Sequence, residues 1–203
     1  MSGATNPPPK PPSADDDAFK RELVALIPHL RAFARTLTGD PTAADDLAQD
    51  AMMKAWDARA SYQMGTNMKA WTFMILRNQF YSEKRRSWRQ TQLDQEAAER
   101  TLVAVDDPES PVALDELRLA LATLPEEQRE ALILVGAGGF AYEEAAEICQ
   151  CAVGTVKSRV SRARKALQAT LEKGGYARDG RAAGDAMRSI LAAADRLSSV
   201  RQG

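Results

Sequence analysis

The segment from Gly154 to Leu167 constrains the fold of this chain most, because it is apolar on one helical face and cationic on the others. Its apolar residues recur at the spacing of a surface helix that presents one stripe to a core, namely Val156, Val160, Ala163 and Leu167. The remaining positions include five basic side chains and two serines, and the segment contains no acid. These outward residues are Lys157, Ser158, Arg159, Ser161, Arg162, Arg164 and Lys165. The pattern predicts a DNA-recognition helix.

A second, shorter helix precedes this one at close range. Residues 142–148 form a short acidic helical pattern, and only Cys149 to Ala152 connect it to the basic helix. This order is typical of a helix-turn-helix, in which the second helix enters the major groove of DNA and the first holds it in place. The alternative is a solvated basic helix on the surface of a bundle. The close spacing of the two helices favours the DNA-binding interpretation over this alternative.

The composition is that of a globular protein. Its 203 residues allow one or two domains, and 44% apolar content is enough to form cores. Lys and Arg number 27 against 28 Asp and Glu, so the near-zero net charge conceals opposite local fields. No apolar run reaches transmembrane length and the N-terminus lacks a secretory pattern, so we expect a cytoplasmic protein without membrane contact.

Residues that usually carry chemistry are scarce. Cys149 and Cys151 are too close for an ordinary disulfide and lack the further ligands of a zinc site, so we expect both to fill small apolar gaps. His29 is the only histidine and is expected on a helix surface. The chain also lacks a Gly-rich phosphate loop and a Ser/His/Asp set. We therefore expect no enzyme activity, metal, cofactor or small-molecule substrate.

The first half of the chain predicts a proline-rich tail followed by a helical domain. Residues 1–14 have nothing to bury and are expected to be disordered. A helical stripe then extends to Leu37, and Pro28 predicts a kink or break in it near Ile27. Thr42 is the expected cap of the next helix.

Two surfaces of this domain, residues 15–89, have alternative interpretations. The second helix has a polar face that is either simply solvated or docks on a basic partner helix, and it carries Asp45, Asp46, Gln49 and Asp50. The third helix, expected from about Met68 to Arg86, mixes aromatic residues with a basic end. Its aromatics are either core or form, with the cations, a platform on which single-stranded bases stack.

The composition changes after residue 89. The charged residues of 90–111 are six acids and one arginine, and two prolines lie near the end of the segment, which predicts an extended linker between two separate helical domains. The second domain, residues 112–173, adds two helices before the helix-turn-helix, the second with Pro125 in its first turn. The extension 174–203 has an amphipathic stripe that predicts a partner-binding or self-docking helix, with a weakly ordered tail as the alternative; the stripe is Met187, Ile190, Leu191, Ala194 and Leu197. The predicted fold class is all-α with two small domains.

Five motifs together resemble a known family. They are DDLAQD (45–50), GTNMKAW (65–71), LRNQFY (76–81), LPEEQREAL (124–132) and GTVKSR (154–159). In order and spacing they are similar to those of the extracytoplasmic-function (ECF) sigma factors of RNA polymerase. Residues 26–35 and 133–137 narrow the resemblance to the EcfG type, which drives the general stress response of alphaproteobacteria. The resemblance covers about residues 18 to 172.

The resemblance implies a partner for each surface. The first domain would bind core RNA polymerase through Asp45, Asp46, Gln49 and Asp50, and would open the minus-ten promoter element. An unpaired base would be captured at Tyr62 and Asn78, with the single strand also meeting Asn67, Lys84, Arg85 and Arg86. The second domain would read the minus-thirty-five element with Lys157, Ser158, Ser161 and Arg162, while Arg159, Arg164 and Lys165 would meet phosphates. The implied inhibitor is an anti-sigma factor of the NepR type that bridges both domains.

This chain departs from the family in two places, and two rival functions are open. The family often has Ser or Thr before each helix of the helix-turn-helix, whereas this chain has Ala141 and Ala152, and each missing cap costs about 1 kcal/mol. The extension from Gly174 is the second departure. The rivals are a sigma-like decoy that only sequesters an anti-sigma factor, and an ordinary helix-turn-helix repressor. The basic recognition helix argues against the first, and the aromatic-basic third helix argues against the second.

Overall fold

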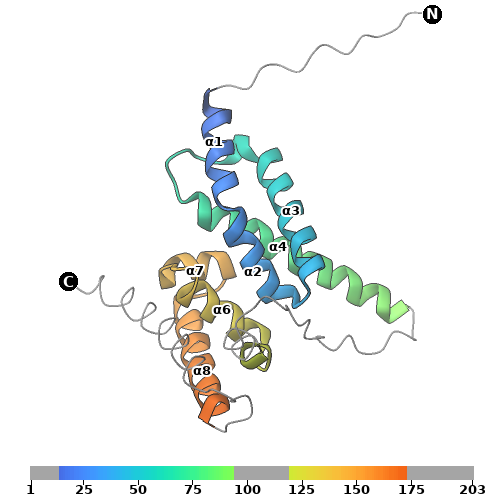
Figure 1. Ribbon diagram of the computed structural model, residues 1–203, viewed down its shortest axis with the longest axis vertical. Helices are drawn as coiled ribbons and strands as arrows, with labels where there is room; N and C mark the ends of the chain where they lie inside the picture. Colours follow the sequence, from blue (N-terminus) through green and yellow to red (C-terminus); the bar gives the residue numbers. More distant parts are fainter. Residues whose placement is uncertain (1–13, 94–118, 173–203) are drawn as a thin grey trace, which may run out of the picture.

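The computed structural model describes residues 14–93 and 119–172, and every regular element within these two ranges is a helix (Figure 1). The first range contains α1 (Ala14–Ala25), α2 (Ile27–Thr38), α3 (Pro41–Asp57), the short 3-10 helix η1 (Arg59–Ser61) and α4 (Met68–Leu93). The second contains a helical turn at 119–122, then α6 (Glu126–Gly136), α7 (Tyr142–Cys149) and α8 (Val153–Glu172). The all-α prediction is confirmed for these ranges. The predicted terminal segments and most of the predicted linker lie outside the described residues.

Pro28 divides the first predicted helix into two. α1 ends at Ala25 and α2 begins at Ile27, so the proline lies in the first turn of α2, where its missing amide donor is not needed. The predicted break is thus confirmed. At the other end of α2, Gly39 adopts a left-handed φ of 72°, and its amide donates a hydrogen bond to the Arg35 carbonyl at 3.0 Å.

The cap of α3 differs from the prediction. Asp40, not Thr42, precedes the helix, and its carboxylate accepts a hydrogen bond from the Ala43 amide at 2.7 Å. The backbone of Asp40 is extended, with a φ of −118°, which aims its side chain at the free amides of the first turn. Thr42 already lies inside that turn, because Pro41 takes the first helical position.

α4 is longer than predicted and continues past Arg86 to Leu93. No glycine or proline interrupts residues 87–93, so the helix includes the first residues assigned to the linker. Its start is as predicted. Asn67 caps it, since the side-chain oxygen accepts a hydrogen bond from the Ala70 amide at 3.0 Å.

The helix-turn-helix lies at the predicted place. Gln150 adopts a left-handed φ of 53° directly after α7, and the Cys151 amide donates to the Ala146 carbonyl at 3.0 Å. Cys149 is buried, as predicted for a small apolar filler, whereas Cys151 is half-buried. Pro125 precedes α6 instead of lying within its first turn.

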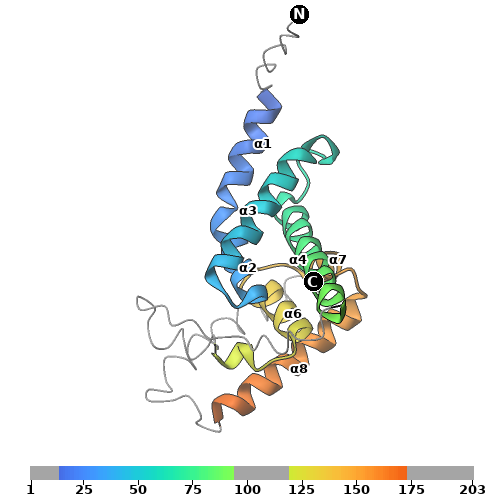
Figure 2. The ribbon, with the colours of Figure 1, turned by 90° about the vertical axis from the view of Figure 1, so that its right-hand side faces the viewer.

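The two helical domains pack directly against one another, an arrangement on which the sequence made no prediction. α4 lies against α7, and α2 lies against α6 (Figure 2). The core is continuous across the boundary. Phe73 stacks on Phe33 with 4.9 Å between ring centroids, and Phe140 of the second domain meets Phe73 edge-on at 5.0 Å. Periodicity assigns buried faces to a helix but does not say which element covers each face, so this packing was not predictable from the pattern.

Candidate DNA- and partner-binding surfaces

The apolar stripe of α8 is buried and its basic face is exposed. Val156, Val160, Ala163 and Leu167 are each at most 1% exposed, which confirms the predicted orientation. On the opposite side the exposed residues include Lys157, Ser161, Arg162 and Lys165. This arrangement presents cations and a hydroxyl together on one ridge, held in place by α6 and α7 beneath it. Such a ridge has the shape and charge that a major groove accepts.

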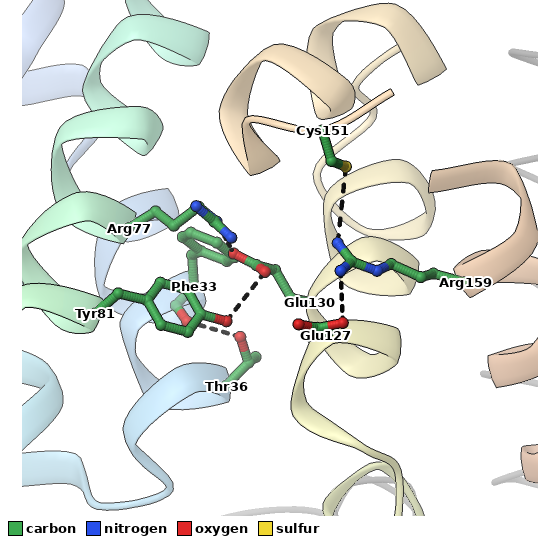
Figure 3. A network of polar contacts seen from close by, with 8 residues as sticks. All are labelled: Phe33, Thr36, Arg77, Tyr81, Glu127, Glu130, Cys151 and Arg159. Atoms are coloured by element: carbon green, nitrogen blue, oxygen red, sulfur yellow. Dashed lines mark hydrogen bonds and ion pairs between the residues drawn. The ribbon is translucent and has the colours of Figure 1, made fainter. Parts of the chain in front are cut away.

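Three of the predicted DNA contacts on α8 are less accessible. Arg159 is half-buried, forms an ion pair with Glu127, and points a second guanidinium nitrogen at the Cys151 sulfur at 3.7 Å (Figure 3). Ser158 is also half-buried, and its hydroxyl donates to the Thr155 carbonyl at 2.9 Å. Arg164 is half-buried as well. The predicted DNA contacts that remain exposed, Lys157, Ser161, Arg162 and Lys165, therefore occupy a narrower face of α8 than the sequence predicted.

The helix-turn-helix compensates for one of its missing caps. Ala141 offers no side-chain acceptor, but Glu144 accepts a hydrogen bond from the Ala141 amide at 2.8 Å, which is the carboxylate half of a capping box. The other oxygen of Glu144 accepts from the Asn67 amide group at 2.8 Å. Glu144 thus stabilises the start of α7 and also joins the second domain to the first.

Tyr62 lies in the core of the first domain. Its side chain is among the buried residues at 8% exposed, and its ring packs against Phe19 at 5.7 Å and Trp71 at 5.1 Å between centroids. The hydroxyl donates to the Thr66 carbonyl at 2.8 Å, which ties the loop before α4 to this cluster. In this conformation the ring is not available to stack on a base.

The other predicted single-strand contacts lie along α4 and differ in their partners. Asn78 is exposed on this helix, as are Arg85 and Arg86 near its C-terminal half. Lys84 instead forms an ion pair with Glu126 of the second domain, and Asn67 is held by Glu144. The second domain therefore occupies two of the polar groups that the sequence assigned to DNA.

The aromatic residues of α4 divide between the two interpretations. Phe73 is buried in the core, whereas Phe80 and Tyr81 are half-buried and Trp88 is 64% exposed. The Lys84 ammonium lies 5.8 Å from the centre of the Phe80 ring. The first part of the helix is core, and the later part combines partly open rings with cations.

The polar face of α3 is open to solvent. Asp46, Gln49 and Asp50 are exposed. Asp45 forms a bidentate ion pair with Arg31 of α2, and this hydrogen bonding lowers the pKa of the carboxyl. Three polar groups therefore point outward in a row, with a fourth fixed beside them.

Sequence reasoning missed a buried polar cluster between the domains. The Glu130 side chain on α6 has no exposed surface, accepts from the Arg77 guanidinium at 2.6 Å, and accepts from the Tyr81 hydroxyl at 3.2 Å (Figure 3). Burial raises the pKa of Glu130 despite the opposing charge of Arg77, and burial also raises the pKa of Tyr81. One signal was available, because Glu130 precedes buried Leu134 by one helical turn and so falls on the apolar face of its helix.

Another cross-domain contact comes from Lys69 at the start of α4. Its ammonium donates to the Gly138 carbonyl at 2.7 Å and lies 5.0 Å from the centre of the Phe140 ring. Burial lowers the pKa of this lysine. The side chain thus fixes the loop between α6 and α7 against the first domain.

His29 is exposed on α2, as predicted. Within the two described ranges, no three His, Cys, Asp or Glu side chains gather in a way that would hold a metal ion. None of the helices in those ranges combines the length and apolarity needed to cross a bilayer.

Comparison with known proteins finds matches for both domains. The family model "Sigma-70 region 2" matches residues 23–90, and "Sigma-70, region 4" matches residues 114–167. The chain is 46% identical over 155 residues to the ECF RNA polymerase sigma factor EcfG of Rhodopseudomonas palustris, which covers 76% of this chain and 86% of that protein.

Solved structures agree with this result. The sigma factor RpoE of Bartonella quintana, solved in complex with the anti-sigma factor NepR, superposes with a TM-score of 0.70 at 47% identity, over 77% of this chain and 98% of that one. The PhyRSL–NepR complex of Sphingomonas sp. Fr1 matches with a TM-score of 0.53 at 20% identity, over 74% of this chain and 87% of the other, which shows the fold alone.

Proposed function

The chain belongs to the extracytoplasmic-function sigma factors, which direct core RNA polymerase to promoters, and from this premise we propose how its surfaces divide that work. The family is one of transcription initiation factors, and we assign the chain no catalytic chemistry of its own. The observation that carries the assignment is the exposed basic ridge of α8 above a buried apolar stripe. A decoy that only sequesters an inhibitor does not need such a ridge.

The second domain reads the minus-thirty-five element with α8. Lys157, Ser158, Ser161 and Arg162 meet base edges, and Lys165 and Arg164 meet phosphates beside them. Arg159 joins the phosphate contacts only after it leaves Glu127, because the ion pair holds its guanidinium in the described state. The exposure of Lys157, Ser161, Arg162 and Lys165 supports this division, whereas Ser158 and Arg164 are half-buried.

The first domain holds the opened minus-ten element along α4. Exposed Asn78 reads the edge of an unpaired base, while Arg85 and Arg86 follow the backbone. Asn67 and Lys84 join them when the domains separate and release both side chains from the second domain. Tyr62 stacks on the base only after the loop before α4 leaves the aromatic cluster.

The polar face of α3 binds the polymerase. Asp46, Gln49 and Asp50 form its exposed row, and Asp45 beside them is held by Arg31. Acidic side chains on a short helical face suit a basic partner helix, and the attraction raises the rate of association.

An anti-sigma factor of the NepR type controls this protein, which acts in the cytoplasm in a general stress response. The likeness to the Bartonella quintana sigma factor supports this regulation, because that protein was solved with NepR and matches over both domains. We assign residues 15–89 and 112–173 to the two functional domains. The acidic residues 90–111 connect them through the channel of the polymerase.

Transcription in vitro with the cognate core polymerase tests the proposal. Full-length protein is added to core enzyme on a promoter of the stress-response type, and start-site-specific transcripts are measured. We expect transcripts that depend on the protein and are lost when a NepR-type inhibitor is added. A protein that binds the duplex but yields no specific transcript would be a repressor, and one that binds only the inhibitor would be a decoy.

A further inference from the structure

An open apolar groove runs between α1, α2 and α3. It has a volume of about 650 Å³, and its apolar wall comprises Leu23, Val24, Ile27, Ala48, Met52, Met53 and Trp56. Val24 is 48% exposed and Met53 is 58% exposed, so two of the four large apolar side chains that are exposed in the described ranges lie in this groove. Exposed apolar surface of this kind marks a binding site for an apolar partner.

The shape and rim of the groove favour one kind of occupant. A groove lined by helices accepts the apolar face of another helix, and the adjacent methionines Met52 and Met53 adapt to its side chains. On the α3 side the rim carries Asp57, with Asp46 and Asp50 on the neighbouring turns, while Asp45 is already paired with Arg31 of α2 and Lys20 lines the α1 side. The preferred occupant is thus an amphipathic helix with basic residues beside its apolar stripe.

Three segments of this chain lie outside the described residues, and each is a candidate occupant of the groove. Their sequences show which of them fits. Residues 1–13 contain five prolines and cannot supply a helix. Residues 94–118 carry eight acids against two arginines, so the acidic rim would repel them. Residues 173–203 carry six basic side chains against three acids, together with the predicted stripe from Met187 to Leu197.

The C-terminal segment is also long enough to reach the groove. Fourteen residues separate the end of α8 at Glu172 from Met187. When extended they span about 50 Å, whereas about 150 folded residues form a body roughly 40 Å across. Tethering supplies an effective concentration on the order of millimolar, so even a weak helix would occupy the groove.

We propose that residues 187–197 fold as an amphipathic helix into the groove between α1, α2 and α3. Ile190, Leu191 and Ala194 pack on the wall that holds Met53, and Arg188, which lies beside Leu191 on the helix, pairs with the acidic rim. The groove borders Asp45 and Gln49, so the docked segment blocks part of the face proposed to bind polymerase. Docking itself does not depend on that assignment, but the competition with polymerase rests on it.

Photocrosslinking tests the docking directly. Full-length protein carries benzoylphenylalanine in place of Met53, is irradiated at several concentrations, and is digested for mass spectrometry. We expect crosslinks from position 53 to residues 187–197 of the same molecule, at a yield independent of concentration. A crosslinked dimer whose yield rises with concentration would identify a second copy as the occupant and overturn the proposal. The absence of any crosslink to the C-terminal segment would overturn it as well.

Matched variants test the contribution of the stripe. Leu191→Glu places a charge on it, whereas Ala192→Glu places the same charge on the opposite face. We expect Leu191→Glu to abolish the crosslink and Ala192→Glu to preserve it. Equal crosslinking in both variants would overturn the proposal.

A measurement of the affinity for core polymerase tests separately whether the docked segment competes with polymerase. If the segment occupies the groove nine-tenths of the time, Leu191→Glu should raise the affinity for core about tenfold. Loss of the crosslink without a change in affinity would support docking and overturn the assignment of this face to polymerase.

Discussion

Arg77 and Glu130 form an ion pair between the two domains, with 2.6 Å between the guanidinium nitrogen and a carboxylate oxygen that has no exposed surface. Four further polar contacts to the second domain start at or beside the same helix, α4, from Asn67, Lys69, Tyr81 and Lys84. The partners of Asn67 and Lys84 are carboxylates. The second domain therefore covers part of the helix that we assign to minus-ten DNA, and its acids lie where the helix would otherwise meet phosphates.

The ion pair predicts how the interface responds to mutation. Arg77→Leu leaves Glu130 buried without its cation, and breaking a buried pair in this way costs about 3–5 kcal/mol. Because the pair lies between the two domains, we expect the domains to separate while the helices persist. Small-angle scattering should show a larger radius of gyration, with unchanged helical circular dichroism.

The double variant Arg77→Leu with Glu130→Leu is the matched control. It replaces the pair with apolar side chains, a change that is often neutral, so it should stay compact. A single Arg77→Leu variant that is as compact as the wild type would show that the pair contributes little to the closed arrangement.

The raised pKa of Glu130 predicts a pH dependence. A carboxyl whose pKa is higher in the folded state than in the unfolded state binds more protons when folded. It therefore stabilises the fold most below its ordinary pKa, and this contribution is lost as pH rises through the raised value. The free energy of unfolding of the wild type, compared with that of Glu130→Gln between pH 4 and 8, should fall with rising pH. An unchanged difference over this range would mean that the carboxyl titrates normally.

Tyr62 and Asn78 should respond differently to truncation. Tyr62 is buried among aromatic rings, so Tyr62→Ala should lower the free energy of unfolding by about 3–5 kcal/mol, whereas Tyr62→Phe loses only a hydrogen bond worth about 1 kcal/mol. Asn78 is exposed, so Asn78→Ala should leave stability unchanged but weaken promoter opening. Thermal unfolding and permanganate footprinting measure the two effects. Normal opening by Asn78→Ala would remove this residue from the minus-ten contacts.

The sequence predicted the helices better than their mutual packing. Stripes such as that of α8 repeat within one helix, so burial of Val156 and Val160 followed from spacing alone. Arg77 and Glu130 are 53 residues apart, and neither residue shows in its own helix which charge it will meet. The prediction of the cap of α3 was wrong for a local reason. Asp40 and Thr42 are both residue types that cap helices, and only the extended backbone of Asp40 decides between them.

The basic residues of the recognition helix α8 should fall into two classes, those that contact base edges and those that contact phosphates. Exposed Arg162 lies opposite the buried stripe and can reach base edges, so Arg162→Ala should remove about 1–3 kcal/mol of discrimination between promoter and scrambled duplex. Lys165→Ala is the matched control, since loss of a phosphate contact should weaken both duplexes alike and lower the salt slope by about one unit. Binding of the full chain to both duplexes is measured across a salt series. If Arg162→Ala weakened both by the same factor, Arg162 would be a phosphate contact, and the helix would lie in the groove with a different face inward.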